Sequence, residues 1–518
     1  MRRIVTVALA AGVTAVAAAS GAVAQDEPPT AVSAVPIPPG QIDAAIGQLD
    51  GLATQMLAQT GVPGMAIAVV HDDRVVYARG FGVRRLGDPA PIDADTVFQL
   101  ASVSKAVGAS VVAGAVGRRV VGWDDPVIAH LPGFRLKRRD TTRNVTIADL
   151  YAHRSGLPDH AGDDLEPLGY SRAQILHRLR YQPLTPLRAE YAYTNYGLTA
   201  AALAVARAAG TPWADLSERT LYRPLGMRST SSRFADFERA RDRAWPHVLR
   251  DGTWVPIAAP FNPDRESPAG GVTSSVNDLA QWMRMMLADG VYDGRRVVGA
   301  SALATMRTPH AVSAAPATPS SRPGFYGLGL NTGADPTGRV YFSHSGAFEE
   351  GAATQVSLLP SERLGIVVLT NGEPMGLPES LTQTFLDLVE LGHASRDWMG
   401  LYGPAFAAAK QSSSPLAGRP RPSHPRPARA RSAYLGPYRS AYLGRSRVVA
   451  RGGQLVLVAG PARKTYTLRH WSGDTFTTGT GRLFGAVTFA GRDARGRATA
   501  VTVDSLNLSG LGTYRRAG

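Results

Sequence analysis

A serine and a lysine three residues apart carry the clearest chemical signal in this sequence. They are Ser102 and Lys105, the two ends of a Ser-Val-Ser-Lys run. Lysine stands at only 4 of the 56 basic positions, so a site that needs nothing but positive charge would hold arginine in this chain. Lysine can release its proton and act as a base, whereas arginine effectively cannot. We therefore predict that Ser102 is a nucleophile that becomes acylated and that Lys105 helps to deprotonate it.

The residues that follow Ser102 predict that it begins a helix. Small and branched apolar side chains fill residues 103–116, which is typical of a buried helix. In a first helical turn, free backbone N–H groups and the helix dipole stabilise the negative charge that forms on a reacting serine. Side chains three residues apart lie on one face of a helix, so Ser102 and Lys105 can meet.

Other catalytic arrangements find little support. There is no Gly-X-Ser-X-Gly elbow, and no local motif places any of the 11 histidines as the base of a triad. One short stretch holds residue types that bind metals, but its loop composition favours solvated or capping roles. These residues are His153, Asp159, His160, Asp163 and Asp164. We predict neither a metal nor a cofactor.

The N-terminus has the pattern of a cleavable export signal. Arg2 and Arg3 precede an almost wholly apolar run over residues 4–19, and the small residues 22–24 suit a signal peptidase. We expect a signal peptide over residues 1–24 and a periplasmic or secreted mature protein. An uncleaved membrane anchor is the alternative, but the run is shorter than the ~20 residues that a membrane span needs. The chain has no cysteine, which excludes disulfides and thiolate nucleophiles.

The formal net charge of +15 is concentrated near the C-terminus. From residue 408 onward, 19 lysines and arginines face 3 acidic residues, which leaves 37 basic against 38 acidic residues over 1–407. Because the catalytic region is neutral, we do not expect a nucleic-acid partner. The basic C-terminal region fits electrostatic contact with an anionic cell envelope, and ordinary solvated arginine is the alternative.

The order of strands and helices predicts an α/β fold for residues 40–395. Strands are expected at 65–71, 75–78, 327–331, 339–343, 352–358 and 365–370, and helices at 41–60 and 379–391. Strands from both ends of this region flank a long helical stretch. We therefore expect an antiparallel sheet sandwiched by helices, with an all-helical lobe inserted between its two halves.

Two further segments follow this domain, as a length of 518 residues suggests. Residues 408–432 read as a basic linker, since 412–431 hold five prolines, five arginines and no acidic residue. Beyond it, short strand-like runs recur with glycine or aspartate between them. We predict a small antiparallel β-barrel over residues 433–518.

Three motifs, taken in order, resemble the serine β-lactamase and penicillin-binding protein superfamily, in particular its class C β-lactamase, esterase and D-aminopeptidase branch. They are Ser102-Val103-Ser104-Lys105, Tyr193-Thr194-Asn195 and His344-Ser345-Gly346. Flanking phrases at 145–157, 224–227 and 268–271 also look like members of this family. The resemblance covers about residues 40–390. The C-terminal β domain loosely resembles the lipocalin-like modules that follow some of these hydrolases.

The resemblance implies roles for the first two motifs. Ser102 would be the nucleophile, and Lys105 and Tyr193 would share the general-base role, with the lysine cation favouring a phenolate. Asn195 would hydrogen-bond both Lys105 and a substrate amide.

The resemblance also implies that the third motif binds the substrate. The backbone N–H groups of Ser102 and Ala347 would form the oxyanion hole, with Gly346 and Ala347 on an edge strand that faces the helix start. The motif departs from the Lys-Thr-Gly of β-lactamases because His344 replaces the lysine. A mostly neutral imidazole is a poorer partner for the carboxylate of β-lactams and D-Ala-D-Ala termini. A structural strand role for His344 is the alternative.

We expect an exported serine hydrolase that forms an acyl-enzyme on Ser102 and cleaves ester or amide bonds of a small molecule or short peptide. The absent lysine favours esters and D-amino-acid peptides, with β-lactams as a further candidate. A penicillin-binding sensor, or a cell-wall peptide-binding protein that acylates without turnover, is the alternative. The sequence names neither the substrate nor the oligomeric state.

Overall fold

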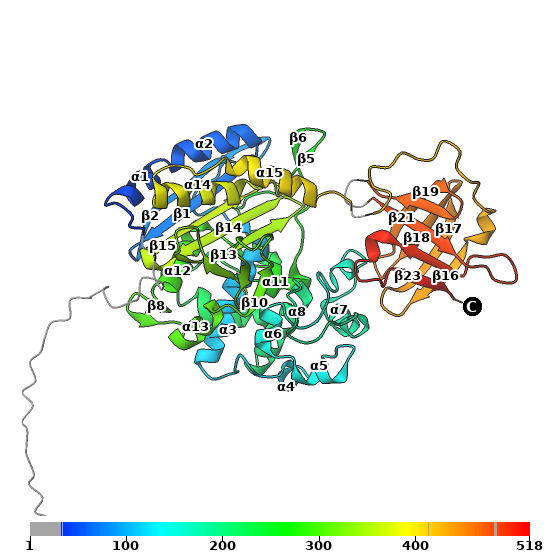
Figure 1. Cartoon of the computed structure of the whole chain (residues 1–518), viewed down its shortest axis with the longest axis horizontal. Helices are drawn as coiled ribbons and strands as arrows, with labels where there is room; N and C mark the ends of the chain where they lie inside the picture. Colours follow the sequence, from blue (N-terminus) through cyan, green and yellow to red (C-terminus); the bar gives the residue numbers. More distant parts are fainter. Residues whose placement is uncertain (1–32, 34, 413, 481–483, 518) are drawn as a thin grey trace, which may run out of the picture.

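The computed structural model describes residues 33, 35–412, 414–480 and 484–517. The predicted signal peptide, residues 1–24, lies outside the described residues. The described chain forms a large mixed α/β domain and an eight-stranded barrel at the C-terminal end (Figure 1). The α/β sandwich and the C-terminal barrel that the sequence predicts are both confirmed.

The α/β domain is built on a nine-stranded antiparallel sheet. In spatial order its strands are β10 (Ala311–Ala314), β11 (Gly324–Tyr326), β12 (Asn331–Ala334), β13 (Val340–Phe348), β14 (Ala352–Leu359), β15 (Leu364–Thr370), β1 (Gly64–His71), β2 (Arg74–Arg85) and β3 (Asp88–Pro91). Strand β1 pairs with β15 from Met65 to His71, although the two strands are far apart in the sequence. Strands from both ends of the domain thus pair in one sheet, as predicted.

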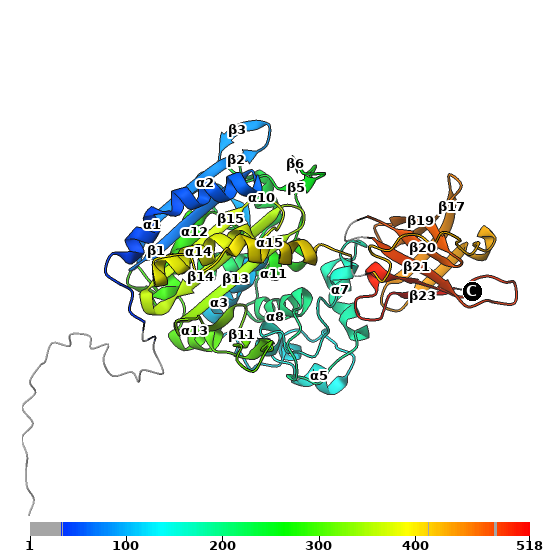
Figure 2. The ribbon, with the colours of Figure 1, turned by 45° about the horizontal axis from the view of Figure 1, so that its top comes forward.

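Helices cover both faces of this sheet. Successive residues of a strand point to opposite faces, so each strand contributes side chains to both layers. Met65, Ile67 and Val69 face one layer, made by α1 (Gln41–Gly47), α2 (Leu49–Thr60) and α14 (Leu377–Leu391). Ala66 and Ala68 face the other layer, where α3 (Ser104–Gly117) and α12 (Val276–Leu287) pack. Figure 2 shows α1, α2 and α14 on the same side of the sheet.

The segment between the two groups of strands is mainly helical. Its helices are α4 (Val127–His130), α5 (Arg139–Asn144), α6 (Ile147–Tyr151), α7 (Arg172–Arg178), α8 (Asn195–Ala208), α9 (Trp213–Ser217), α10 (Phe234–Arg239), α11 (Ser267–Gly270) and α13 (Ala300–Arg307). Short strand pairs interrupt them: β4 (Phe98–Gln99) with β7 (Thr273–Ser274), β5 (His247–Arg250) with β6 (Thr253–Pro256), and β8 (Val291–Tyr292) with β9 (Arg295–Arg296). Helix α6 begins at a capping box in which Thr146 and Asp149 bond reciprocally to backbone N–H groups.

Two local expectations differ from the structure. The strand expected at 327–331 is a connection, because β11 ends at Tyr326 and β12 begins at Asn331, with Gly329 at φ +80° between them. Helix α15 (Trp398–Ala409) was not predicted, since Pro404 and two glycines interrupt its pattern. It packs against α14. None of the helices in the described part of the chain is both long and apolar enough to span a membrane.

The C-terminal barrel closes on itself. Its strands are β16 (Gly436–Ser440), β17 (Gly444–Arg451), β18 (Gln454–Ala459), β19 (Lys464–Ser472), β20 (Thr475–Thr478), β21 (Gly485–Ala490), β22 (Ala500–Val503) and β23 (Thr513–Arg516). The preceding basic segment runs along the barrel, where the Gly473 N–H donates to the Arg426 carbonyl oxygen at 2.7 Å. On the side next to α7, the Tyr170 hydroxyl donates to the carbonyl oxygen of Leu443 at 2.9 Å (Figure 2).

Candidate active site

Ser102 lies in a single 3-10 turn, Ala101–Val103, that leads directly into helix α3. Ala101 has φ +46°, a left-handed conformation that costs free energy for a residue with a Cβ atom. Strand β13 holds this turn closely: a Cβ atom at Gly346 would overlap the Leu100 carbonyl oxygen and lie 2.9 Å from the Ser102 nitrogen. Glycine is therefore required where β13 passes the serine.

Lys105 Nζ lies 3.0 Å from Ser102 Oγ, as the helical spacing predicts. It also donates to Asn195 Oδ1 at 2.7 Å and to the carbonyl oxygen of Ala269 at 2.9 Å. An ammonium group has three N–H donors, and these three acceptors use all of them. When Lys105 is neutral, its two remaining N–H groups donate to Asn195 Oδ1 and to the Ala269 carbonyl oxygen. The lone pair is then directed at the serine hydroxyl.

The Lys105 side chain is fully buried, and the loss of hydration lowers its pKa from 10.5 to about 8. The carboxyl groups of Glu266 and Asp163 oppose this shift, but burial outweighs them. At a pKa near 8, about a tenth of the lysine is neutral at pH 7, whereas an unshifted lysine would be almost wholly protonated. Lys105 can therefore take up a proton near neutral pH.

Tyr193 lies on the other side of the serine oxygen, to which its hydroxyl donates at 2.8 Å. Burial raises the pKa of Tyr193 well above its ordinary value, and the hydrogen bond to Ser102 opposes this only in part. Lys105 Nζ lies over the phenol ring, 4.5 Å from its centroid. The phenolate that we expected is therefore not favoured in the free protein. The protonated phenol can donate a proton, which leaves Lys105 as the better base.

Asn195, the first residue of α8, joins Lys105 to the half-buried carboxylate of Asp163. Its Nδ2 donates to Asp163 Oδ2 at 3.0 Å while its Oδ1 accepts from Lys105. Asp163 also bonds His160 Nδ1 at 2.8 Å, and this bond raises the pKa of His160. The amide is thus oriented from both sides.

The two histidines considered as metal ligands instead position the loop that carries Tyr193. The backbone N–H of Thr194 donates to His153 Nδ1 at 3.1 Å, and the His153 and Tyr193 ring centroids lie 4.5 Å apart. The backbone N–H of His160 donates to the carbonyl oxygen of Tyr193 at 2.7 Å, and the centroids of the two rings lie 5.7 Å apart. Across the described ranges, no three histidine or acidic side chains are grouped as a metal site would require.

Ala347 and Ser102 line the same pocket, as an oxyanion pair requires. The expectation that Ala347 lies on an edge strand was wrong, because β13 is interior to the sheet between β12 and β14. Strand β12 pairs only with residues 340–343 of β13, however. Residues 345–348 extend beyond the end of β12, so this part of β13 has the local character of an edge.

His344 is buried and neutral. Its Nε2 lies 2.9 Å from the Tyr326 hydroxyl, and its Nδ1 lies 2.6 Å from the carbonyl oxygen of Ser345. Nδ1 must therefore donate and Nε2 must accept, which fixes the tautomer. Burial, reinforced by the charge of Lys105, lowers the pKa of His344 to about 3. The third motif thus supplies no cation to the pocket.

Comparison with known protein families identifies the α/β domain. A family model described as Beta-lactamase matches residues 49–389. The chain belongs to the serine hydrolases of the β-lactamase family. A second model, described as a domain of unknown function (DUF3471), matches residues 420–512. The family membership inferred from the three motifs is confirmed.

Several named relatives share this β-lactamase-family domain. Unguisins hydrolase ungD' of Aspergillus campestris (strain IBT 28561) is 30% identical over 330 residues, which are 61% of this chain and 59% of that protein. Esterase EstB of Burkholderia gladioli is 27% identical over 384 residues, 67% of this chain and 96% of the esterase. D-alanyl-D-alanine-carboxypeptidase/endopeptidase AmpH of Escherichia coli (strain K12) is 23% identical over 353 residues, 66% of this chain and 88% of AmpH.

Among solved structures, the octameric penicillin-binding protein homologue from Pyrococcus abyssi has the same fold. It superposes with a TM-score of 0.59 at 21% identity and covers 89% of this chain and 98% of its own. At this identity the likeness concerns the fold, including the β-lactamase-type sheet and its helical layers.

The pocket of this β-lactamase-family enzyme has a volume of about 430 Å³. Ser102, Tyr193, His344 and Ala347 line it together with aromatic Tyr191 and Tyr326. Lys105, Asn195 and Gly346 lie behind this surface and act on the lining residues. The structure thus brings all seven residues selected from the sequence to one place.

The pocket also receives Phe406 and Ala409 from α15 and Lys410 directly after this helix, all beyond the matched domain. Lys410 forms an ion pair with Glu373 at 2.7 Å. Sequence reasoning gave Lys410 no role, although the scarcity of lysine that singled out Lys105 applies to it equally. No motif marks it, because its place depends on how α15 packs on α14.

Proposed function

We propose that this protein is an exported serine hydrolase that forms an acyl-enzyme on Ser102. The observation that carries the proposal is the position of Ser102 Oγ, 3.0 Å from Lys105 Nζ and 2.8 Å from the Tyr193 hydroxyl. One group can accept the serine proton and the other can supply a proton to the leaving group.

The acylation step begins when neutral Lys105 accepts the proton of Ser102. The serine oxygen then attacks the substrate carbonyl carbon, and the carbonyl oxygen, now negative, is held by the N–H groups of Ser102 and Ala347. As the bond to the leaving group breaks, Tyr193 donates its proton to the departing oxygen or nitrogen. Lys105, protonated in the first step and beside the phenol ring, returns a proton to Tyr193.

The deacylation step reverses these proton transfers with water as the attacking group. A water molecule gives a proton to neutral Lys105 and attacks the acyl carbon. The bond from Ser102 to that carbon breaks, Tyr193 donates its proton to the serine oxygen, and Lys105 returns the proton from water to Tyr193. This completes a turnover without a cofactor.

The pocket lining next to His344 favours uncharged acyl groups over groups that carry a carboxylate. His344 is neutral, and Tyr191, Tyr193 and Tyr326 supply aromatic walls. Esters and D-amino-acid peptides or amides are therefore the proposed substrates, and the name of the esterase relative agrees with the first of these classes. β-Lactams rank below them because the lysine of the third motif is absent.

The test uses the purified mature protein with p-nitrophenyl esters, D-amino-acid amides and nitrocefin. Steady hydrolysis of at least one substrate is expected, with Ser102→Ala losing it and a fluorophosphonate labelling the parent at Ser102. Full activity of Ser102→Ala would refute the proposal. Stoichiometric labelling without turnover of any substrate would favour the alternative of a sensor that acylates only.

We also propose that the mature protein lies in the periplasm or outside the cell, where its basic segment contacts an anionic surface. Arg419, Arg421 and Arg426 are exposed on this segment. The protein should sediment with phosphatidylglycerol vesicles at low salt but not with phosphatidylcholine vesicles. Replacing these three arginines by glutamine should release it, whereas the same change at exposed Arg207, Arg223 and Arg239 should not. Equal release by both variants would contradict a specific role for the segment.

A further inference from the structure

A second cavity, of about 830 Å³, lies next to the catalytic pocket. Strands β13 and β14 form its floor, and helices α14 and α15 cover it. Ser345 and Phe406 line both spaces, so the two are neighbours along β13. Helix α15 is a loose cover, since it has no buried residue.

The floor of this cavity is polar, which a packing role does not explain. Strand register places Ser343 opposite Ser357 and Ser345 opposite Gln355, all four on the face that lines the cavity. On the same sheet face, the adjacent strand β15 presents Ile366 and Val368, which pack in an apolar core. Apolar side chains would stabilise the sheet if a helix packed here directly. A polar floor beneath a hollow instead indicates contact with a polar ligand.

Three buried oxygen atoms in the lining of this cavity accept no hydrogen bond within the described residues. One is Asp335 Oδ2, in a partly exposed side chain. The other two are Gln355 Oε1 and Glu379 Oε2, in side chains that are 6% and 7% exposed. The other carboxylate oxygen of Glu379 accepts a hydrogen bond from Ser345. A buried acceptor without a donor costs free energy. The amide oxygen of Gln355 is always an acceptor, and Glu379 Oε2 is one whenever this carboxyl is ionised. The missing ligand group is therefore a hydrogen-bond donor.

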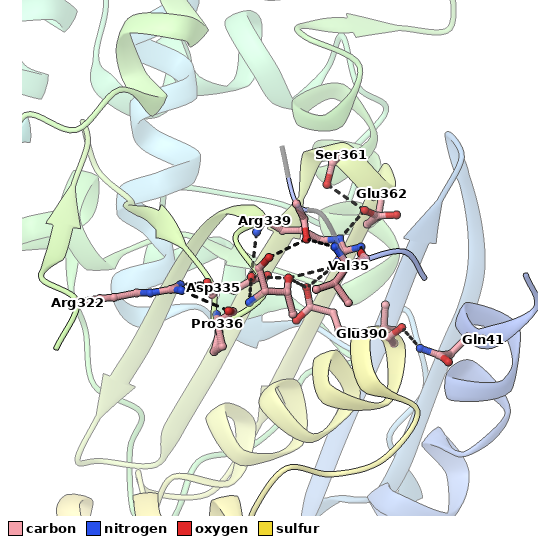
Figure 3. Close-up of polar contacts among 12 residues, drawn as sticks. Val35, Gln41, Arg322, Asp335, Pro336, Arg339, Ser361, Glu362 and Glu390 are labelled. Carbon is pink, nitrogen blue, oxygen red and sulfur yellow. Dashed lines mark hydrogen bonds and ion pairs between the residues drawn. The ribbon is translucent and has the colours of Figure 1, made fainter. Parts of the chain in front are cut away.

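The other carboxylates of the cavity, those of Asp335, Asp387 and Glu390, each have at least one oxygen with a hydrogen-bond or ion-pair partner. Asp335 Oδ1 accepts from the Thr337 N–H at 2.8 Å. Glu390 pairs with Arg339, whose Nη1 lies 3.4 Å from Glu390 Oε1 (Figure 3). Asp387 accepts hydrogen bonds from the Ser395 N–H and from Trp398 Nε1, both at 2.7 Å. Glu379 has no cationic side chain paired with it in the described chain. Of the two carboxyl groups here that are more than nine-tenths buried, Glu390 thus has a cationic partner and Glu379 has none among the described residues.

Aromatic side chains form much of the remaining wall: Tyr341, Trp398, Tyr402 and Phe406. Such rings attract cations, and the Arg396 guanidinium at the cavity edge already lies 5.1 Å from the centroid of the Trp398 ring. Leu359 and Leu386 add apolar surface. The walls therefore suit a cation with an apolar part.

We propose that this cavity is a binding site for a small molecule with a primary ammonium group and a short apolar tail. Its N–H groups bond Glu379 Oε2 and Gln355 Oε1, and its tail lies against the aromatic wall. Burial raises the pKa of Glu379 to about 7, and a bound ammonium would hold the carboxyl ionised. The site is separate from Ser102 chemistry, so it stands or falls independently of the hydrolase proposal.

The test uses n-hexylammonium as the probe, with n-hexanol and hexanoate of equal chain length, in calorimetric titrations of the mature protein. Hexylammonium is expected to bind and the other two are not. Glu379→Gln should weaken binding by about tenfold or more, since it removes the charge but keeps an acceptor for Ser345. The same substitution at the exposed Glu190 is the matched control and should change nothing.

Two further variants keep the result decisive. Gln355→Leu should also weaken the binding of hexylammonium. This variant replaces Glu379→Gln as the test if Glu379→Gln does not fold. Ser102→Ala should leave it unchanged, which separates this cavity from the catalytic pocket. Equal binding of hexanoate, unchanged affinity in both cavity variants, or loss of binding in Ser102→Ala would each overturn the proposal.

Discussion

Asn195 Oδ1 accepts a hydrogen bond from Lys105 Nζ at 2.7 Å, and this contact links the catalytic lysine to a carboxylate it does not touch. The other end of the same amide bonds Asp163. A neutral amide thus stands between the buried lysine and a half-buried carboxylate. If Asp163 contacted the lysine directly, its charge would raise the lysine pKa and hold the proton there. The amide orients Lys105 while leaving its pKa low.

The pH dependence of the reaction should follow Lys105. Because only the neutral amine can accept the serine proton, kcat/KM should rise with pH and level off above an apparent pKa near 8. Lys105→Arg should lower kcat/KM by about 10²–10⁴-fold, since arginine keeps its proton. Initial rates with a p-nitrophenyl ester between pH 5 and 9.5 measure both effects. A flat profile in the parent protein would contradict the role of Lys105.

A charge placed at Asn195 should move that profile. Asn195→Asp puts a carboxylate 2.7 Å from the lysine ammonium, which favours the charged lysine and raises its pKa. The rising limb of kcat/KM should therefore shift to higher pH, and the rate at pH 7 should fall. Asn195→Leu, which adds no charge, is the comparison: it should lower the rate without an alkaline shift. If kcat/KM rose over the same pH range in all three proteins, Asn195 would not set the pKa of Lys105.

Gly346→Ala should disrupt the serine turn. The new Cβ atom would overlap the Leu100 carbonyl oxygen and the Thr354 hydroxyl, so β13 would be pushed away from Ser102. Displacing the Ala347 N–H from the developing oxyanion should reduce kcat by about 10²–10³-fold. The melting temperature should also fall. Gly403→Ala is the matched control, because a Cβ atom there meets nothing within 4 Å. Similar kinetics for both variants would refute this account of Gly346.

The sequence was sufficient for the parts of the site that depend on local spacing. Three-residue helical spacing brings Ser102 to Lys105, and the continuous apolar runs of β1 and β15 predict the buried strands at the centre of the sheet. The ordered motifs then added Tyr193 and Asn195, which no periodicity places near Ser102. Their contact depends on the path of the helical lobe, and family resemblance supplied that knowledge.

Protonation and long-range packing could not be predicted in the same way. The phenolate expected at Tyr193 fails because its pKa follows from burial, which only the fold reveals. The edge character of residues 345–348 depends on where β12 ends. Pro404 interrupts the helical pattern of α15, so the sequence did not predict this helix. The contribution of Phe406 and Lys410 to the pocket was therefore not predicted either.

Lys410 should influence which substrates the pocket accepts. It is the cation that α15 adds to the pocket lining, and it balances Glu373 at 2.7 Å. Lys410→Gln leaves Glu373 without this partner, so the pocket edge becomes more negative and repels anionic substrates. For an ion pair that is partly exposed, the expected change in KM is about two- to fivefold. It should appear with mono-p-nitrophenyl succinate and not with neutral p-nitrophenyl acetate. Lys464→Gln, on the barrel, is the control. Equal KM changes for both esters would show that Lys410 stabilises the position of α15 and does not select substrates by charge.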